Sequence, residues 1–252
     1  MEAIKRLAKL IIESKRTVVF TGAGISTESG IPDFRSPGGI WSRYDPEDFT
    51  IQKFLSGPVA RRNIWKMSAE SGLLTAAEPN PAHYAIARLY RLGRLDCVVT
   101  QNIDNLHQKA GVPADKVFEL HGNMEWAVCL NCSRRFPMHE VLQRIGEGLE
   151  VPDCPDCHGI LKPDAVFFGE ALPQETLQEA IRHSRNCELF IVIGSTLVIY
   201  PAAYIPTYAV EAGAKLAIVN LTETPFDHYA TVTIREKAGD IMSKVVEKLE
   251  LS

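Results

Sequence analysis

Four cysteines stand as two matched Cys-x-x-Cys pairs, Cys129/Cys132 and Cys154/Cys157. Each pair can place two sulfurs on one tight turn, and two such turns facing each other form a tetrahedral thiolate cage. The loop between the pairs is slightly longer than the usual zinc-ribbon loop of about 15–20 residues. Four protein ligands leave no position for water or substrate, so the sequence predicts a structural zinc site. A redox dithiol or a disulfide pair is the alternative, and it fits two matched turns in a cytosolic-looking chain less well.

A glycine-rich turn, Gly22-Ala23-Gly24-Ile25-Ser26, follows the apolar run Thr17–Thr21. Such a turn lets the backbone approach a phosphate, and the helix that follows offers unpaired N–H groups. Thr27 stands where the dinucleotide fingerprint has its third glycine, so a tight turn without a ligand is the alternative. Two later strand ends, Gly194-Ser195-Thr196 and Asn220, favour a nucleotide, because open α/β sheets bind ligands at the carboxyl ends of their strands.

Polar side chains also follow two other apolar runs. Thr100-Gln101-Asn102-Ile103-Asp104 is expected to face a ligand, because buried polar groups without partners are costly. His121-Gly122 follows Val117–Leu120, and a histidine there could act as a general base because its pKa lies near neutrality. A structural histidine is the alternative. His83 and His107 lie in helical segments and are interpreted as packing or surface residues.

The loop Gly30-Ile31-Pro32-Asp33-Phe34-Arg35 combines a carboxylate, an aromatic ring and a guanidinium. Pro32 stiffens it, and a loop of this kind could close over a bound nucleotide and exclude water. An ordinary surface connection is the alternative.

The elements that must position these residues are short apolar strands alternating with helical segments. That alternation predicts an α/β fold with a parallel sheet covered on both faces. The expected strands are Thr17–Thr21, Leu95–Thr100, Leu189–Gly194 and Leu216–Asn220, with Val117–Leu120 and Thr231–Ile234 as weaker candidates, and the expected helices include Pro81–Leu92 and Glu175–His183. Ser36–Pro79 and Met124–Pro163 interrupt this rhythm and are predicted to form a smaller module beside the sheet.

Composition is that of an ordinary globular protein, with 46% hydrophobic and 23% charged residues among 252. A formal net charge of −4 gives no reason to expect nucleic-acid binding. No apolar run is long enough to span a bilayer, and Met1–Lys15 is predicted to form an amphipathic helix rather than a signal peptide. Cys97 and Cys187 are expected to be buried thiols. These features together predict a cytoplasmic location.

The motifs together resemble those of the sirtuin family of NAD-dependent protein deacylases. The resemblance runs from about Ile11 to the C-terminal helix and includes Lys162–Glu170, which is similar to the family's substrate-strand segment. The most similar members are the small bacterial and archaeal ones. The resemblance implies a Rossmann-type NAD-binding domain formed by residues 1–35, 80–123 and 164–252. It implies a small module with a helical insertion (36–79) and a zinc-ribbon insertion (124–163).

The activity implied by the resemblance is removal of acyl groups from protein lysine side chains at the expense of NAD. The acyl oxygen attacks the nicotinamide-ribose carbon and expels nicotinamide, and the ribose hydroxyls then take the acyl group. The products are free lysine, nicotinamide and 2′-O-acyl-ADP-ribose.

The resemblance also assigns roles to residues. His121 would be the base that activates a ribose hydroxyl, and Asn102 would orient the ribose and a water. Asp104 and Ile103 would hold the nicotinamide carboxamide, with Ser26 and Ile31 nearby. The full set implied to contact NAD is Gly22, Ala23, Ser26, Thr27, Ile31, Asp33, Phe34, Arg35, Gln101, Asn102, Ile103, Asp104, His121, Gly194, Ser195, Thr196, Asn220, Leu221, Lys237 and Ala238.

The substrate peptide would be held as an added strand between two segments. Val166, Phe167, Gly169 and Glu170 would lie on one side, and Val198, Ile199 and Tyr200 on the other. This mode takes its affinity mainly from backbone hydrogen bonds.

One departure from the motifs of the family narrows the range of acyl groups expected in the substrate. Family members that prefer succinyl or malonyl groups carry a Tyr-x-x-Arg pair in the helical insertion, and this chain has no tyrosine between Tyr44 and Tyr84. A neutral acyl group, acetyl or a longer fatty chain, is therefore predicted.

The alternatives to lysine deacylation are protein mono-ADP-ribosyl transfer and NAD sensing without catalysis. The intact Asn102, Asp104 and His121 speak against NAD sensing. Thr27 disfavours a hydride-transferring dehydrogenase. The sequence makes no prediction of oligomeric state.

Overall fold

The computed structural model describes residues 1–71 and 76–251, and its centre is a six-stranded parallel sheet. All six apolar runs predicted as strands form it. The strands are β1 (Thr17–Thr21), β2 (Cys97–Thr100), β3 (Val117–Glu119), β7 (Leu189–Ile193), β8 (Lys215–Val219) and β9 (Ala230–Ile234), in the order β3-β2-β1-β7-β8-β9. The chain progresses to one side of β1 with β2 and β3 and to the other side with β7, β8 and β9. The order therefore reverses beside β1, which is where doubly wound sheets open a ligand crevice.

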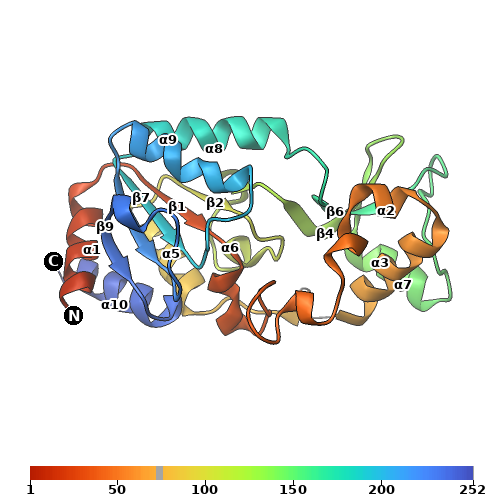
Figure 1. The fold of residues 1–252 in the computed structure, drawn as a ribbon, viewed down its shortest axis with the longest axis horizontal. Coiled ribbons are helices and arrows are strands. Elements are labelled where there is room, and N and C mark those ends of the chain that lie inside the picture. The colour runs from red at the N-terminus through yellow and green to blue at the C-terminus, as the bar shows by residue number, and fades with distance from the viewer. Residues whose placement is uncertain (72–75, 252) are drawn as a thin grey trace.

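Helices cover both faces of this sheet, as the sequence predicted (Figure 1). The helices are α1 (Glu2–Glu13), α5 (Pro81–Arg91) and α10 (Ala238–Glu250) on one face, and α8 (Gln174–Asn186) and α9 (Ile205–Glu211) on the other. Strand β1 serves both layers, because Val19 packs into the first while Val18 and Phe20 pack into the second. Burial of a strand on both faces explains its continuous apolar sequence.

The small module lies at the other end of the elongated molecule and contains a second sheet (Figure 1). Its antiparallel strands are β4 (Gly122–Cys129), β5 (Arg135–Pro137) and β6 (Leu161–Ala165), in the order β5-β4-β6, and its helices are α2 (Ile51–Leu55), α3 (Pro58–Ser71) and α7 (Met138–Gly146). Trp65 of α3 is fully buried in one cluster with Cys129 and Met138. The two segments predicted as insertions therefore share a core.

Short elements connect these parts. They are α6 (Leu106–Lys109) and the 3-10 helices Ala23–Ser29, Ile40–Ser42, Pro46–Phe49, Ala114–Lys116, Ala202–Tyr204 and Asp227–Tyr229. None of the helices within the described residues has the length and apolar character needed to cross a membrane.

Candidate active site

The glycine-rich turn after β1 packs directly against the turn after β7. The Gly24 N–H donates to the Gly194 carbonyl at 2.9 Å, and Gly194 itself has φ of +63°. A Cβ on Gly24 would lie 2.8 Å from that carbonyl oxygen, closer than a side chain tolerates. The glycines are thus required by contact between two strand ends, in addition to any approach of a ligand.

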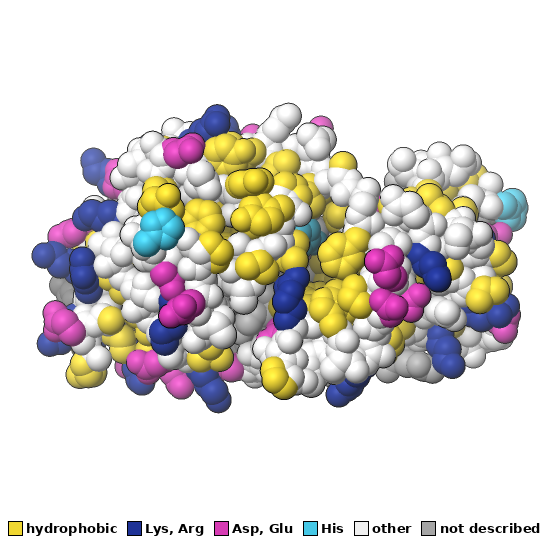
Figure 2. Space-filling view, in the orientation of Figure 1, with side chains coloured by type: hydrophobic (Ala, Val, Ile, Leu, Met, Phe, Trp, Pro, Cys, Tyr) yellow, Lys and Arg dark blue, Asp and Glu magenta, His cyan; other side chains and the backbone are white. Residues whose placement is uncertain are grey.

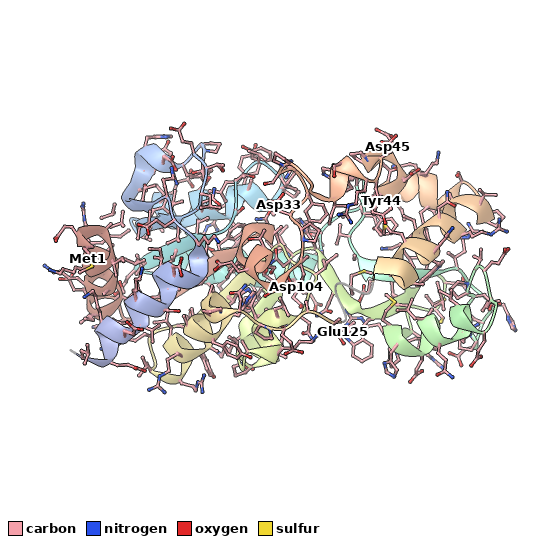
Figure 3. All side chains as sticks on the ribbon, turned by 90° about the horizontal axis from the view of Figure 1, so that it is seen from below. Met1, Asp33, Tyr44, Asp45, Asp104 and Glu125 are labelled. Carbon is pink, nitrogen blue, oxygen red and sulfur yellow. The ribbon has the colours of Figure 1, made fainter. Side chains whose placement is uncertain are left out.

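Three predicted site residues meet beside this turn in a buried hydrogen-bonded network. Ser26 Oγ donates to Asp104 Oδ2 at 2.6 Å and accepts from Asn102 Nδ2 at 3.1 Å. Asp104 Oδ1 accepts from the Leu106 N–H at 3.0 Å. The three side chains come from the ends of β1 and β2, and they are 1–8% exposed. Figure 3 places Asp104 and Asp33 near the middle of the molecule, between the large sheet and the small module.

The side chain of His121 is held by a backbone carbonyl. Its Nδ1 lies 2.9 Å from the Gln101 oxygen, and because a carbonyl only accepts, Nδ1 carries the proton. Nε2 is then the basic nitrogen. Burial lowers the pKa of His121, and the bond to Gln101 opposes that shift only in part. Burial therefore favours the neutral form of this imidazole, and the bond to Gln101 fixes the tautomer of that form, at the junction of β3 and β4.

Gln101 and Ser195 connect this region to the far side of the crevice. Gln101 Nε2 donates to Ser195 Oγ at 2.8 Å, which joins the ends of β2 and β7. Ser195 is 5% exposed and Asn220 is 8% exposed. Thr196, Leu221 and Lys237 are exposed. The residues predicted for the adenosine half of NAD therefore line the carboxyl ends of β7 and β8 and the start of α10.

The loop after the glycine-rich turn is stabilised by its own carboxylate. Asp33 accepts from the Arg35 N–H at 2.9 Å, the Ser36 N–H at 2.7 Å and the Ser36 hydroxyl at 2.6 Å. Burial opposes ionisation, but these bonds outweigh it and hold the pKa of Asp33 below its usual value. Phe34 packs on Trp41, with ring centroids 5.1 Å apart. Asp33 thus shapes the loop, while Phe34 anchors it to an aromatic cluster.

Two polar residues that the sequence analysis did not single out fix the same turn from outside. Asn80 Nδ2 donates to the Ile25 carbonyl at 2.7 Å, while its Oδ1 caps α5 by accepting from the Ala82 N–H. Glu28 accepts from the Gly239 N–H at 2.9 Å, at the first turn of α10. An asparagine before Pro81 signals a helix cap. Nothing local in the sequence predicts the long-range contact of either residue.

The two predicted substrate-binding segments reach one hydrophobic cluster, because Val166 packs against the cluster that contains Leu197, the residue before Val198. Figure 2 shows hydrophobic side chains gathered on the face of the molecule between the large-sheet part and the small module. Val166 donates its N–H to the His121 carbonyl at 2.8 Å, so this segment lies directly beside the candidate base. Phe167 is buried, whereas Phe168, Val198 and Tyr200 are exposed.

The four paired cysteines converge at the end of β4. Cys129 and Cys157 sulfurs are 3.5 Å apart, and Cys132 and Cys154 sulfurs are 3.8 Å apart. A tetrahedron with Zn–S bonds of about 2.3 Å has edges of about 3.8 Å, so the donor set fits zinc. The N–H groups of Asn131 and Cys132 point at Cys129 Sγ, as they would to stabilise a thiolate. The four-cysteine cluster is thus a zinc site by its chemistry and spacing.

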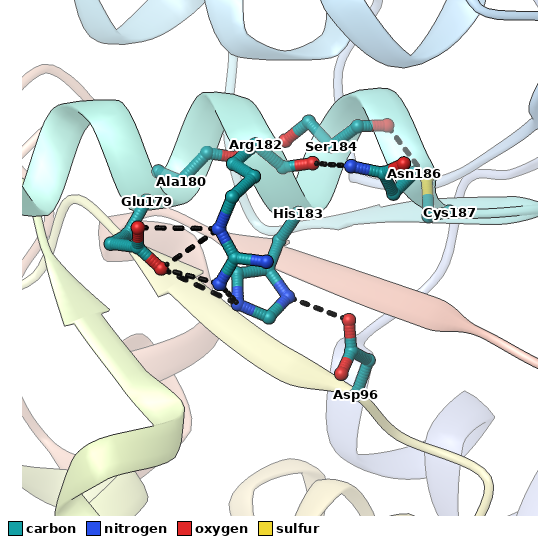
Figure 4. Close-up of polar contacts among 8 residues, drawn as sticks. All are labelled: Asp96, Glu179, Ala180, Arg182, His183, Ser184, Asn186 and Cys187. Carbon is teal, nitrogen blue, oxygen red and sulfur yellow. Dashed lines mark hydrogen bonds and ion pairs between the residues drawn. The ribbon is translucent and has the colours of Figure 1, made fainter.

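A second cluster of potential ligands, Asp96, Cys97 and His183, lies where β2 begins, at the end of that strand away from the candidate site. In Figure 4 both ring nitrogens of His183 are engaged. Nδ1 lies 2.6 Å from Asp96 Oδ2, and Nε2 lies 3.0 Å from Arg182 Nη2. Because no lone pair of the ring is free, we interpret this cluster as a structural link between β2 and α8.

Three comparisons with known proteins agree with this architecture. A family model described as "Sir2 family" matches residues 22–201. The chain is 47% identical to "NAD-dependent protein deacylase 2" of Archaeoglobus fulgidus, covering 99% of this chain and 97% of that protein. It is 45% identical to "NAD-dependent protein deacetylase 1" of Pyrobaculum aerophilum, covering 98% and 95%.

Solved structures show the same relationship. The structure titled "Sir2-p53 peptide-NAD+" has a TM-score of 0.90 and 43% identity, covering 99% of both chains. One titled "Structure of Sir2Tm bound to a propionylated peptide" has a TM-score of 0.89 and 42% identity, also covering 99% of both. The Rossmann-type sheet and the second sheet with its four cysteines agree with sequence similarity that extends over nearly the full length of the chain. This chain is a member of the Sir2 family, the sirtuins.

Proposed function

We propose that this protein removes acyl groups, most readily acetyl, from protein lysine side chains with consumption of NAD. The observation that carries the proposal is the placement of His121. Its Nδ1 proton is committed to the Gln101 carbonyl, and its own carbonyl accepts from the segment that would bind the peptide. The relatives' names and the titles of the related structures, which include acylated peptides and NAD, support the same reaction.

In this proposal NAD is a co-substrate, and when bound it supplies the ribose carbon that accepts the acyl oxygen as nicotinamide leaves. Neutral His121 Nε2 takes the proton of a ribose hydroxyl, which then receives the acyl group. Asn102, Asp104 and Ser26 form the polar pocket for the nicotinamide side. Ser195 and Asn220 serve the adenosine side. One water is consumed to release the lysine nitrogen from the acyl carbon, so the products are free lysine, nicotinamide and 2′-O-acyl-ADP-ribose.

The preference for an acyl-lysine over a free lysine follows from the charge of the lysine side chain. An acyl-lysine side chain is neutral and can enter the apolar surroundings of Val166 and Phe167, whereas a free ammonium would incur a large desolvation penalty there. The product lysine is therefore expected to leave once its charge appears. The peptide would lie as an added strand between Val166–Glu170 and Val198–Tyr200 and would bind mainly through backbone hydrogen bonds.

The remaining parts of the proposal are structural. Zinc bound by the four cysteines would hold the small module and take no part in catalysis, since all four ligands come from protein. The division into a Rossmann-type domain (1–35, 80–123, 164–252) and a small module (36–79, 124–163) is part of the same proposal. So is a cytoplasmic location, which the free thiols of Cys97 and Cys187 support.

Neither ADP-ribosyl transfer to protein nor NAD sensing without catalysis is favoured by an observation. The sensing alternative would have no use for a neutral, tautomer-defined histidine beside the peptide segment.

Incubation with an acetyl-lysine peptide, with and without NAD, tests the proposal by mass spectrometry of both products. We expect free lysine peptide and an equal amount of acyl-ADP-ribose only with NAD. His121→Ala should lower the rate by at least about 100-fold, the lower end of what a general base contributes. His139→Ala, at an exposed histidine of α7, is the matched control and should react like the wild type.

A succinylated twin of the peptide should react more slowly, because the Tyr-x-x-Arg pair is missing. Gain of ADP-ribose on the peptide would favour the transferase alternative, and bound NAD without any product would favour sensing.

A further inference from the structure

Lys162 is a lysine whose ammonium group is buried. It lies in β6 and is 4% exposed. Its Nζ donates to the Ala165 carbonyl at 2.6 Å and the Pro163 carbonyl at 3.1 Å, and it pairs with Glu170 Oε2 at 3.0 Å. An ammonium has three donors, so these three oxygens use its full capacity.

Glu170, the partner of Lys162, also binds the chain between the two residues. Its Oε2 also accepts the Phe167 N–H at 2.6 Å, and Lys162 Nζ lies 4.4 Å from the centre of the Phe167 ring. One ion pair therefore holds both the backbone and the ring of Phe167.

The segment held in this way connects the two sides of the site. At one end, the Val166 N–H donates to the His121 carbonyl at 2.8 Å. At the other end, Phe168 exchanges backbone hydrogen bonds with the helical insertion, donating to Phe49 at 2.9 Å and accepting from Ile51 at 3.0 Å. Lys162 itself is buried and contacts this segment at the Ala165 carbonyl and the Phe167 ring.

The energetics of a buried pair suit a geometric role better than a stabilising one. Burial lowers the pKa of Lys162, and Glu170 opposes that shift. The desolvation penalty of such a pair largely offsets its attraction, so an apolar pair of similar volume would often be as stable. What the pair provides is one fixed arrangement of the two carbonyls, the Phe167 amide and the Phe167 ring around it.

We propose that Lys162 and Glu170 are positioning residues that fix the backbone of Val166–Phe168 relative to His121 and so set the affinity for the substrate peptide. Glu170 acts through Phe167 and Lys162, in contrast to the direct peptide contact that the family resemblance implied. The identity of the bound peptide rests on the proposed function.

The test compares Lys162→Met, Glu170→Gln and the double variant in the full chain. Each single variant should raise KM for the acetylated peptide about tenfold, equivalent to about 1.4 kcal/mol, while KM for NAD stays within about twofold. The double variant should resemble the single ones, because residues that act as one unit are not additive. Glu179→Gln is the matched control: it makes the same chemical change in an exposed ion pair of α8 and should leave both constants unchanged.

Hydrogen exchange of the Phe167 amide gives a readout that does not depend on activity. It should be faster in both single variants and unchanged in Glu179→Gln. An unchanged peptide KM with unchanged exchange would overturn the proposal, as would equal rises in the KM values for peptide and NAD. If Lys162→Met does not fold, the isosteric Glu170→Gln decides. A wild-type protein that fails to deacylate would overturn the proposed function, and Phe167 exchange would still decide the positioning role.

Discussion

The imidazole of His121 differs from the other buried histidines in what its second nitrogen can reach. His83 and His107 are 0% and 1% exposed, and each keeps one buried nitrogen without a partner. His183 has both nitrogens engaged. His121 is only partly buried and uses Nδ1 alone, so Nε2 can receive a proton from a bound ribose.

Because the pKa of His121 is lowered, the decline of activity at acid pH should occur at a lower pH than it would for an ordinary histidine base. Because the neutral form is the base, activity is lost only when the pH falls through the shifted pKa. The value of kcat/KM should therefore remain on its plateau as the pH passes about 6.5, the ordinary histidine value, and decline below it. A decline with its midpoint above 6.5 would contradict the prediction.

The measurement needs a control for unfolding. A group whose pKa is lowered in the folded state binds its proton more readily in the unfolded chain, so stability also falls as the pH drops below about 6.5. Enzyme held at each pH and returned to pH 7.5 before assay should recover full activity if protonation of His121 alone causes the decline.

Among the elements, the junction between β3 and β4 leaves no room for a side chain at Gly122. Gly122 begins β4, has φ of +78° and is paired with Ala165 of β6. A Cβ at this position would lie 2.0 Å from the Asp164 carbonyl oxygen. The glycine thus lets the chain pass from the large sheet to the small one directly after His121.

Gly122→Ala should therefore destabilise the protein and displace the candidate base. Gly148→Ala is the matched control, because Gly148 has φ of +105° but an alanine Cβ there would meet no atom within 4 Å. Both changes incur backbone strain, and only the first adds a clash. We expect the first to cost more by at least about 1–3 kcal/mol in denaturant unfolding. Equal costs would show that backbone strain alone governs the position.

At the scale of the whole molecule, the zinc site and the helical insertion depend on each other. Cys129 and Cys154 are buried in the cluster that also contains Trp65 of α3 and Met138 of α7. Loss of the metal would leave four thiols that need not stay together, and the helices packed around them would lose their support.

Cys154→Ala should therefore lose zinc, lower the melting temperature and reduce activity indirectly. Each kcal/mol lost shifts the melting temperature of a chain of this size by about 2–4 °C, and we expect a larger drop than that. Metal content by atomic absorption and thermal unfolding are the measurements. Cys97→Ala, at a buried thiol of the large sheet, should retain zinc. Full metal content and full stability in Cys154→Ala would disprove the structural role.

Much of the fold could be predicted because its signals are local. Apolar runs bounded by polar residues predicted all six strands of the large sheet, and the paired cysteines predicted the thiolate cluster. Asn102 and Asp104 were singled out because they follow a predicted strand, whereas Ser26 was placed beside Asp104 only by the resemblance to the sirtuins. The strand limits were less accurate: β2 begins at Cys97 rather than Leu95, because pairing with β1 starts only at Cys97.

Tertiary structure alone decided how distant segments meet. Asn80 contacts Ile25 across 55 positions, and Glu28 reaches Gly239 across 211. Packing between separate elements also decides three other features. They are the contact of Gly24 with Gly194, the tautomer of His121 and the ion pair of Lys162 with Glu170. Local patterns specify which elements form and which face is buried, since these follow from the periodicity of neighbouring residues. They do not specify which hydrogen-bond partner a side chain finds, since that depends on where the rest of the chain has packed.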